Sequence, residues 1–163
     1  MAVTTSSKGW HVANWGLWGW IETGLKLVGI GAGIVAFFST SSAAEMMISG
    51  NPNLAAVILV GLLTLGLVGA VFLRFGQREI ISLIFSVLNV LGHAGILIAL
   101  LRAPDQETLP IIFGVFFVLG ELAKQRFLAI SGYTEAGQSS GRMQTLSRVI
   151  LFLYVLLVIL ILL

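Results

Sequence analysis

The polar residues with the clearest chemical interest lie inside an apolar segment of the chain. Residues 80–101, IISLIFSVLNVLGHAGILIALL, form an uncharged run, and His93 is the only histidine inside such a run. Three further polar residues lead up to it at helical intervals of four, three and four residues: Ser82, Ser86 and Asn89. This spacing brings side chains to one face of a helix. Because a polar face turned to lipid is costly, we expect it to contact other helices, a ligand or a small hydrated cavity.

Ionisable residues also occur near the ends of two other apolar segments. Glu121 directly follows the run IIFGVFFVLG, and Lys124 comes three residues later. Glu22 and Lys26 stand four residues apart, in the order that lets the two charges meet on one helix face. A helix that crosses the bilayer must carry Glu121 into the membrane, where its carboxyl group needs a partner.

The helical rise allows the depths of these residues to be compared. Asn89 lies about 13 Å and His93 about 20 Å from the start of their helix, and Glu121 lies about 12 Å from the same side of a hydrocarbon core about 30 Å thick. Asn89 and Glu121 should therefore be level. We expect Asn89 to donate an amide hydrogen bond to Glu121, with Lys26 or Lys124 supplying charge from just below. The predicted intramembrane polar cluster is Ser86, Asn89, His93, Glu121, Lys26 and Lys124.

Several kinds of chemistry are compatible with this cluster. Its simplest role is to hold helices together. A second is ligation of a porphyrin or chlorin metal by His93, because Gly92 and Gly95 clear space beside the ring and neutral imidazole is a common axial ligand. A third is a proton or ion path through His93 and Glu121. No cofactor is predicted from the residues themselves, although a bound lipid between glycine-rich helices is compatible with them.

Several classes of enzyme are not expected, because the residues that their chemistry needs are missing from the sequence. The sequence has no H-E-x-x-H, no phosphate-binding glycine loop and no G-x-S-x-G, and it shows no cluster of histidines and carboxylates typical of a metal site. Cysteine is absent, which excludes disulfides and thiolate ligands. We therefore predict no catalytic residue and no metal site, and we do not expect an enzyme.

The composition identifies the elements that must position these residues. The chain has 163 residues, of which 58% are hydrophobic and 10% charged, far from the roughly 25% charged content of soluble domains. We predict an all-α integral membrane bundle after an interfacial N-terminal segment, residues 1–19. The bundle, residues 20–163, is expected to have five transmembrane helices at about 20–38, 54–73, 80–101, 109–130 and 144–163. Four spans plus a C-terminal interfacial or re-entrant helix is the alternative, because the last apolar run, residues 149–163, covers only about 22 Å.

All four tryptophans of the protein lie in the N-terminal segment or at the first residue of the first predicted span: Trp10, Trp15, Trp18 and Trp20. Tryptophan favours the membrane–water interface, since its ring is apolar and its N–H needs a partner. We interpret these residues as an interfacial anchor, with docking of a partner or a ring-shaped cofactor as the alternative.

The basic residues predict the orientation, because lysine and arginine are retained on the cytoplasmic side. With five spans and a cytoplasmic N-terminus, eight of the nine basic residues fall on the inner side, and Arg102 alone is outside. The C-terminus then lies on the opposite side of the membrane. The net charge of +2 gives no reason to expect nucleic acid as a partner.

These observations predict a small non-catalytic integral membrane subunit that contacts the lipid bilayer and packs into a larger membrane protein complex or with copies of itself. The alternatives are a small oligomeric transporter or channel that uses Asn89, His93 and Glu121, and a pigment- or haem-carrying subunit that uses His93.

Overall fold

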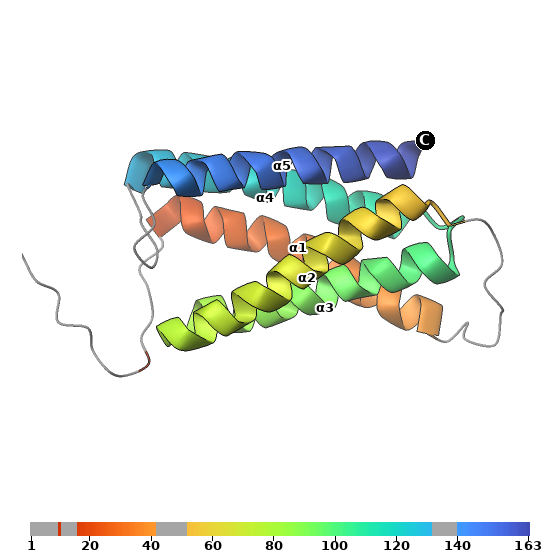
Figure 1. Ribbon diagram of the computed structural model, residues 1–163, viewed down its shortest axis with the longest axis horizontal. Helices are drawn as coiled ribbons and strands as arrows, with labels where there is room; N and C mark the ends of the chain where they lie inside the picture. Colours follow the sequence, from red (N-terminus) through yellow and green to blue (C-terminus); the bar gives the residue numbers. More distant parts are fainter. Residues whose placement is uncertain (1–9, 11–15, 42–51, 132–139) are drawn as a thin grey trace, which may run out of the picture.

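The computed structural model describes residue 10 and residues 16–41, 52–131 and 140–163. This part of the chain is all-helical, and its five helices follow one another without a strand between them (Figure 1). Their bounds are α1 Gly16–Ser41, α2 Leu54–Gln77, α3 Ile80–Arg102, α4 Thr108–Ser131 and α5 Ser140–Leu162. The predicted all-α bundle is confirmed.

Local side-chain chemistry sets where the helices begin and end. The side chain of Asn53 caps α2 by accepting a hydrogen bond from the backbone N–H of Ala56 at 3.1 Å, and Glu79 caps α3 in the same way. Such caps satisfy backbone donors that have no partner inside the helix. Arg78 takes the left-handed conformation with φ 57° and ends α2. The α2–α3 turn is therefore very short, and the two helices form a hairpin.

Several predicted boundaries need correction. α2 continues through Arg74 to Gln77, so the predicted link over 74–79 shrinks to Arg78 and Glu79, because no helix-breaking proline follows Leu73. α1 begins at Gly16, so Trp18 belongs to its first turn rather than to the predicted interfacial segment, and the helix starts four residues before the predicted position 20. α5 begins at Ser140, four residues before the predicted start.

Four helices in the described part of the chain are long and apolar enough to cross a membrane: α1, α2, α3 and α5. α4, which carries Glu121, Lys124 and Arg126 in its second half, is not among them. A membrane location is thus supported, whereas a crossing by α4 stays a prediction.

The central helix of the bundle is α1. It packs against α3 on one side and against α4 on another, α2 packs on α3, and α5 packs on α4. Figure 1 shows the start of α1 between these two outer hairpins and its second half behind α2 and α3, with α2 and α5 approaching each other near the C-terminus. There the side chain of Asn53 donates a 2.6 Å hydrogen bond to the carbonyl of Leu160.

The close approach of α1 and α3 depends on glycine. A Cβ added at Gly33 would overlap the backbone carbonyl of Gly92, and one at Gly95 would overlap the carbonyl of Gly33. Because only glycine allows two helix backbones this close, these residues fix α3 against α1. Gly29 and Gly33 stand four residues apart on α1, and Gly33 faces α3 whereas Gly29 faces the ring of Phe117 on α4.

The charges are divided between the two ends of the bundle. Successive helices run in opposite directions, so α1, α3 and α5 all begin at one end (Figure 1). We call it the basic end, and its described basic residues outside the core are Arg74, Arg78, Lys124, Arg126, Arg142 and Arg148. The opposite end has Arg102, Asp105 and Glu107. This asymmetry agrees with the predicted orientation but does not itself place either end in a compartment.

Candidate functional site: a buried polar network

The polar face of α3 is turned into the bundle, as predicted. Ser82, Ser86 and Asn89 are 7–8% exposed, and His93 is fully buried at 0%. Lys26 of α1 and Glu121 of α4 are equally well covered, at 4% and 2%. The helices therefore bring most of the predicted cluster inside, where each polar group needs a partner within the protein.

An ion-pair network connects α1, α4 and α5. The ammonium of Lys26 donates to Glu22 Oε1 at 2.7 Å and to Glu121 Oε1 at 2.6 Å. The second oxygen of Glu121 accepts a 2.8 Å hydrogen bond from Ser147 Oγ. The predicted Glu22–Lys26 pair is confirmed, and Lys26 joins it to Glu121. Lys124, also predicted as a charge source, is half-buried and forms no ion pair with Glu121.

The prediction that Asn89 donates a hydrogen bond to Glu121 is wrong. Both carboxylate oxygens of Glu121 are occupied by Lys26 and Ser147, and Asn89 Oδ1 is buried without a partner among the described residues. The reason lies in the helix order, because α1 sits between α3 and α4 for much of their length. Lys26, which comes from α1, is therefore nearer to Glu121 than Asn89 is.

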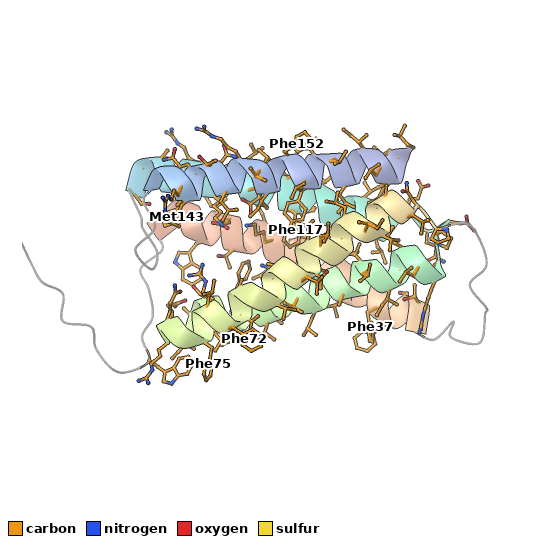
Figure 2. All side chains as sticks on the ribbon, viewed as in Figure 1. Phe37, Phe72, Phe75, Phe117, Met143 and Phe152 are labelled. Carbon is orange, nitrogen blue, oxygen red and sulfur yellow. The ribbon has the colours of Figure 1, made fainter. Side chains whose placement is uncertain are left out.

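A second network surrounds His93. Its Nδ1 lies 2.8 Å from the backbone carbonyl oxygen of Asn89, and its Nε2 lies 2.7 Å from the hydroxyl of Tyr154 on α5. The rings of Phe113 and Phe117 meet the imidazole edge-on, with centroids at 4.7 and 4.8 Å. Figure 2 shows Phe117 in the middle of the bundle, in contrast to Phe152 on the outer side of α5. The imidazole is thus enclosed by aromatic side chains from two helices.

These contacts define the tautomer of a neutral imidazole. A backbone carbonyl can only accept, so Nδ1 carries the hydrogen and donates it to Asn89 O. Nε2 is then an acceptor, and the hydroxyl of Tyr154 donates to it. In this arrangement both ring nitrogens are engaged, and a metal at Nε2 would have to displace Tyr154. The residues around His93 therefore do not fit a porphyrin or chlorin without rearrangement.

Two polar atoms in the interior have no partner among the described residues: Asn89 Oδ1 and Gln125 Nε2. The Lys26 ammonium has three N–H donors and uses two of them on carboxylates. Unused hydrogen-bonding capacity is thus present on α1, α3 and α4. The described residues also contain no group of three histidine, cysteine or carboxylate side chains placed to hold a metal ion.

Two residues of the networks were not predicted from the sequence, Ser147 and Tyr154. Both are buried, at 1% and 3% exposed, and both come from α5. They stand seven residues apart, which is two helical turns and hence one face. That spacing of two hydroxyl groups beside an apolar run is the signal that would have found them.

The three tryptophans that the structure describes lie toward the basic end and are accessible. Trp10, Trp18 and Trp20 are 49%, 37% and 50% exposed, and Trp10 packs edge-on against Phe75 of α2, with ring centroids 5.8 Å apart. Trp15 lies outside the described residues. Exposed indole rings near the ends of apolar helices agree with the predicted anchoring role.

Comparison with known proteins adds no assignment: no protein-family model, no curated protein and no solved structure matches the chain. The function must therefore be argued from the geometry of the chain itself.

Proposed function

We propose that the protein is a small non-catalytic integral membrane subunit that packs laterally into a larger membrane protein assembly, with all five helices crossing the bilayer. In this proposal the N-terminus is cytoplasmic and the C-terminus is on the opposite side. The observation that carries the proposal is the outward face of α2. Of the residues in the apolar stretch of α2, 17% are buried, against 44% in α3.

Glycines on this outward face support the proposal. Gly61, Gly66 and Gly69 have nothing within 4 Å of an added Cβ, in contrast to Gly33 and Gly92, which are packed against another helix. Small residues at a helix surface let a second backbone approach closely in a membrane, where apolar side chains alone give little driving force for association. The face offered to a partner is thus that of α2, and its occupant in this proposal is a transmembrane helix of another protein.

The interior supports a structural role for the polar groups. Lys26 is held by two carboxylates, Glu121 by Lys26 and Ser147, and His93 by Asn89 and Tyr154. Among these contacts, Lys26–Glu121, Ser147–Glu121 and Tyr154–His93 each join two different helices. Interhelical hydrogen bonds of this kind contribute about 0.6–2 kcal/mol each in membranes.

The test compares two substitutions of open glycines. The tagged protein is solubilised gently from its native membrane, alongside Gly66→Leu on α2 and the control Gly31→Leu on α1, which is equally unobstructed. We expect a stoichiometric partner to copurify with the wild type and with Gly31→Leu and to be lost with Gly66→Leu, while thermal stability in detergent is unchanged. A monodisperse single chain from native membranes contradicts the proposal.

One observation favours a small transporter or channel as the second candidate. The unpartnered Asn89 Oδ1 and the third N–H of Lys26 provide hydrogen-bonding capacity for a passing proton or polar solute. Flux into liposomes, compared between the wild type and Glu121→Gln, tests this role. Equal background leakage for both proteins at every pH excludes it.

A further inference from the structure

Two arginines of the α4–α5 hairpin lie on the outer surface of the bundle. Arg126 of α4 and Arg148 of α5 are both exposed, and neither side chain has an ion pair or a hydrogen bond with another described residue. This distinguishes them from Lys26 inside the bundle. We propose that Arg126 and Arg148 bind the headgroup of an anionic phospholipid whose acyl chain lies along the hairpin.

The position of Arg148 along α5 requires an anionic or strongly polar partner. The apolar span of α5 runs from Gly141 to Leu162, so Arg148, fourteen residues before Leu162, lies about 21 Å from the far end of the helix. In a core about 30 Å thick, its Cα is about 9 Å inside the membrane. A guanidinium at this depth is stabilised when the side chain extends to the phosphate level.

The direction of the two side chains brings them toward a common depth. The Cα–Cβ bonds of a helix tilt toward its N-terminus, which for α5 is the basic end and for α4 is the opposite end. Arg148 therefore leans outward toward the phosphates. Arg126, about 27 Å from the start of α4, leans back into the membrane. The hairpin itself is held together by the Ser147–Glu121 hydrogen bond and by Val158 against Gly114.

An apolar surface continues from each arginine toward the middle of the membrane. On α4, Leu122 and Leu119 precede Arg126 by four and seven residues and are 49% and 41% exposed; on α5, Phe152 and Val155 follow Arg148 by four and seven residues and are 64% and 39% exposed. Residues at these intervals share a helix face. A polar contact at one end and an apolar stripe above it match the two parts of a phospholipid.

The chemistry of guanidinium favours a phosphate with net negative charge. Its planar fork of donors fits two phosphate oxygens at once and is weakly hydrated. A zwitterionic lipid carries its own cation beside the phosphate, which repels the arginines. An acidic helix of a partner protein could also pair with them. The lipid is favoured because the two side chains lean toward a common depth on the headgroup side of the membrane and each is continuous with an exposed apolar stripe.

The test measures lipid binding to the full-length protein in detergent by native mass spectrometry, with phosphatidylglycerol and phosphatidylcholine as probes. We expect the wild type to bind phosphatidylglycerol more tightly. At about 1 kcal/mol for each basic residue near an anionic surface, Arg126→Gln and Arg148→Gln should each weaken binding about fivefold, and the double variant about 25-fold. Arg148→Lys keeps the charge but loses the planar pair of donors, so its affinity for phosphatidylglycerol should lie between those of the wild type and Arg148→Gln.

Arg102→Gln is the matched control, because Arg102 is also exposed but lies at the other end of the bundle. It should bind phosphatidylglycerol like the wild type, and all variants should keep the wild-type melting temperature in detergent alone. Equal binding of the two lipids, or an equal loss with Arg102→Gln, overturns the proposal. So does full competition by inorganic phosphate at constant ionic strength, which assigns the site to a free anion. Unchanged lipid binding together with loss of a copurifying protein assigns the arginines to a partner.

Discussion

Removing Lys26 should destabilise the protein more than neutralising Glu121, although the two side chains form one ion pair. Lys26 has two carboxylate partners, Glu22 at 2.7 Å and Glu121 at 2.6 Å. Glu121 has one cationic partner within ion-pair distance and one hydroxyl donor, Ser147. The variants that expose this asymmetry are Lys26→Met and Glu121→Gln.

The expected magnitudes follow from what each variant leaves behind. Lys26→Met leaves the carboxylate of Glu121, whose side chain is 3% exposed, with only Ser147, and an uncompensated buried charge costs about 3–5 kcal/mol. Glu121→Gln keeps an amide oxygen for Ser147, and Lys26 retains Glu22. That variant loses one charge-assisted hydrogen bond, about 1.5–3 kcal/mol.

The assay is reversible unfolding of the full chain in mixed detergent micelles, followed by tryptophan fluorescence. The double variant Lys26→Met with Glu121→Gln completes a thermodynamic cycle. We expect it to be more stable than Lys26→Met alone, because no charge of the Lys26–Glu121 pair is then left buried. The coupling free energy between the two positions should be about 2 kcal/mol, within the range found for residues in contact.

Two results would refute this reasoning. One is a larger loss of stability for Glu121→Gln than for Lys26→Met, since Glu22 would then not be an effective second partner. The other is simple additivity in the double variant, which would mean that Lys26 and Glu121 do not interact in the folded protein.

Three further predictions concern the helix contacts and the topology. Tyr154→Phe removes the hydrogen bond to His93 Nε2 and leaves a buried acceptor unpaired, so the free energy of unfolding should fall by about 1–3 kcal/mol; a thermal melt equal to that of the wild type contradicts this contact. Gly33→Ala places a methyl group against the Gly92 carbonyl and should cost about 1–3 kcal/mol. In the control Gly31→Ala, the added methyl group has no neighbour within 4 Å, so this variant should be as stable as the wild type or more stable by up to about 1 kcal/mol. A Gly33→Ala variant more stable than Gly31→Ala would exclude the close α1–α3 contact. Reporter tags on the two termini should respond from opposite sides of the membrane, and a shared side would rule out five crossings.

The sequence predicts the helices and the burial of the polar face well, because both follow from local patterns. Long apolar runs separated by polar turns define α1 to α5 within a few residues. The intervals between Ser82, Ser86, Asn89 and His93 define one face, which the structure buries. The Glu22–Lys26 contact also follows from spacing alone, since four residues bring two side chains together on any helix.

The partners of the polar residues could not be predicted, because they depend on which helices are neighbours. The equal depths of Asn89 and Glu121 predict a contact between them only if α3 and α4 face each other. Instead α1 packs against both of these helices, and Lys26 reaches Glu121. The glycines that allow this order, among them Gly33 and Gly92, meet only in three dimensions.

The central place of α1 has a consequence for how the protein is made. α1 leaves the ribosome first, but the helices that cover it are synthesised later, and Glu121 follows Lys26 by 95 residues. During insertion, Lys26 has a counter-charge only within its own helix, at Glu22. Glu22 is therefore the partner that offsets the charge of Lys26 before α4 is made, and in the folded chain it shares this ammonium with Glu121.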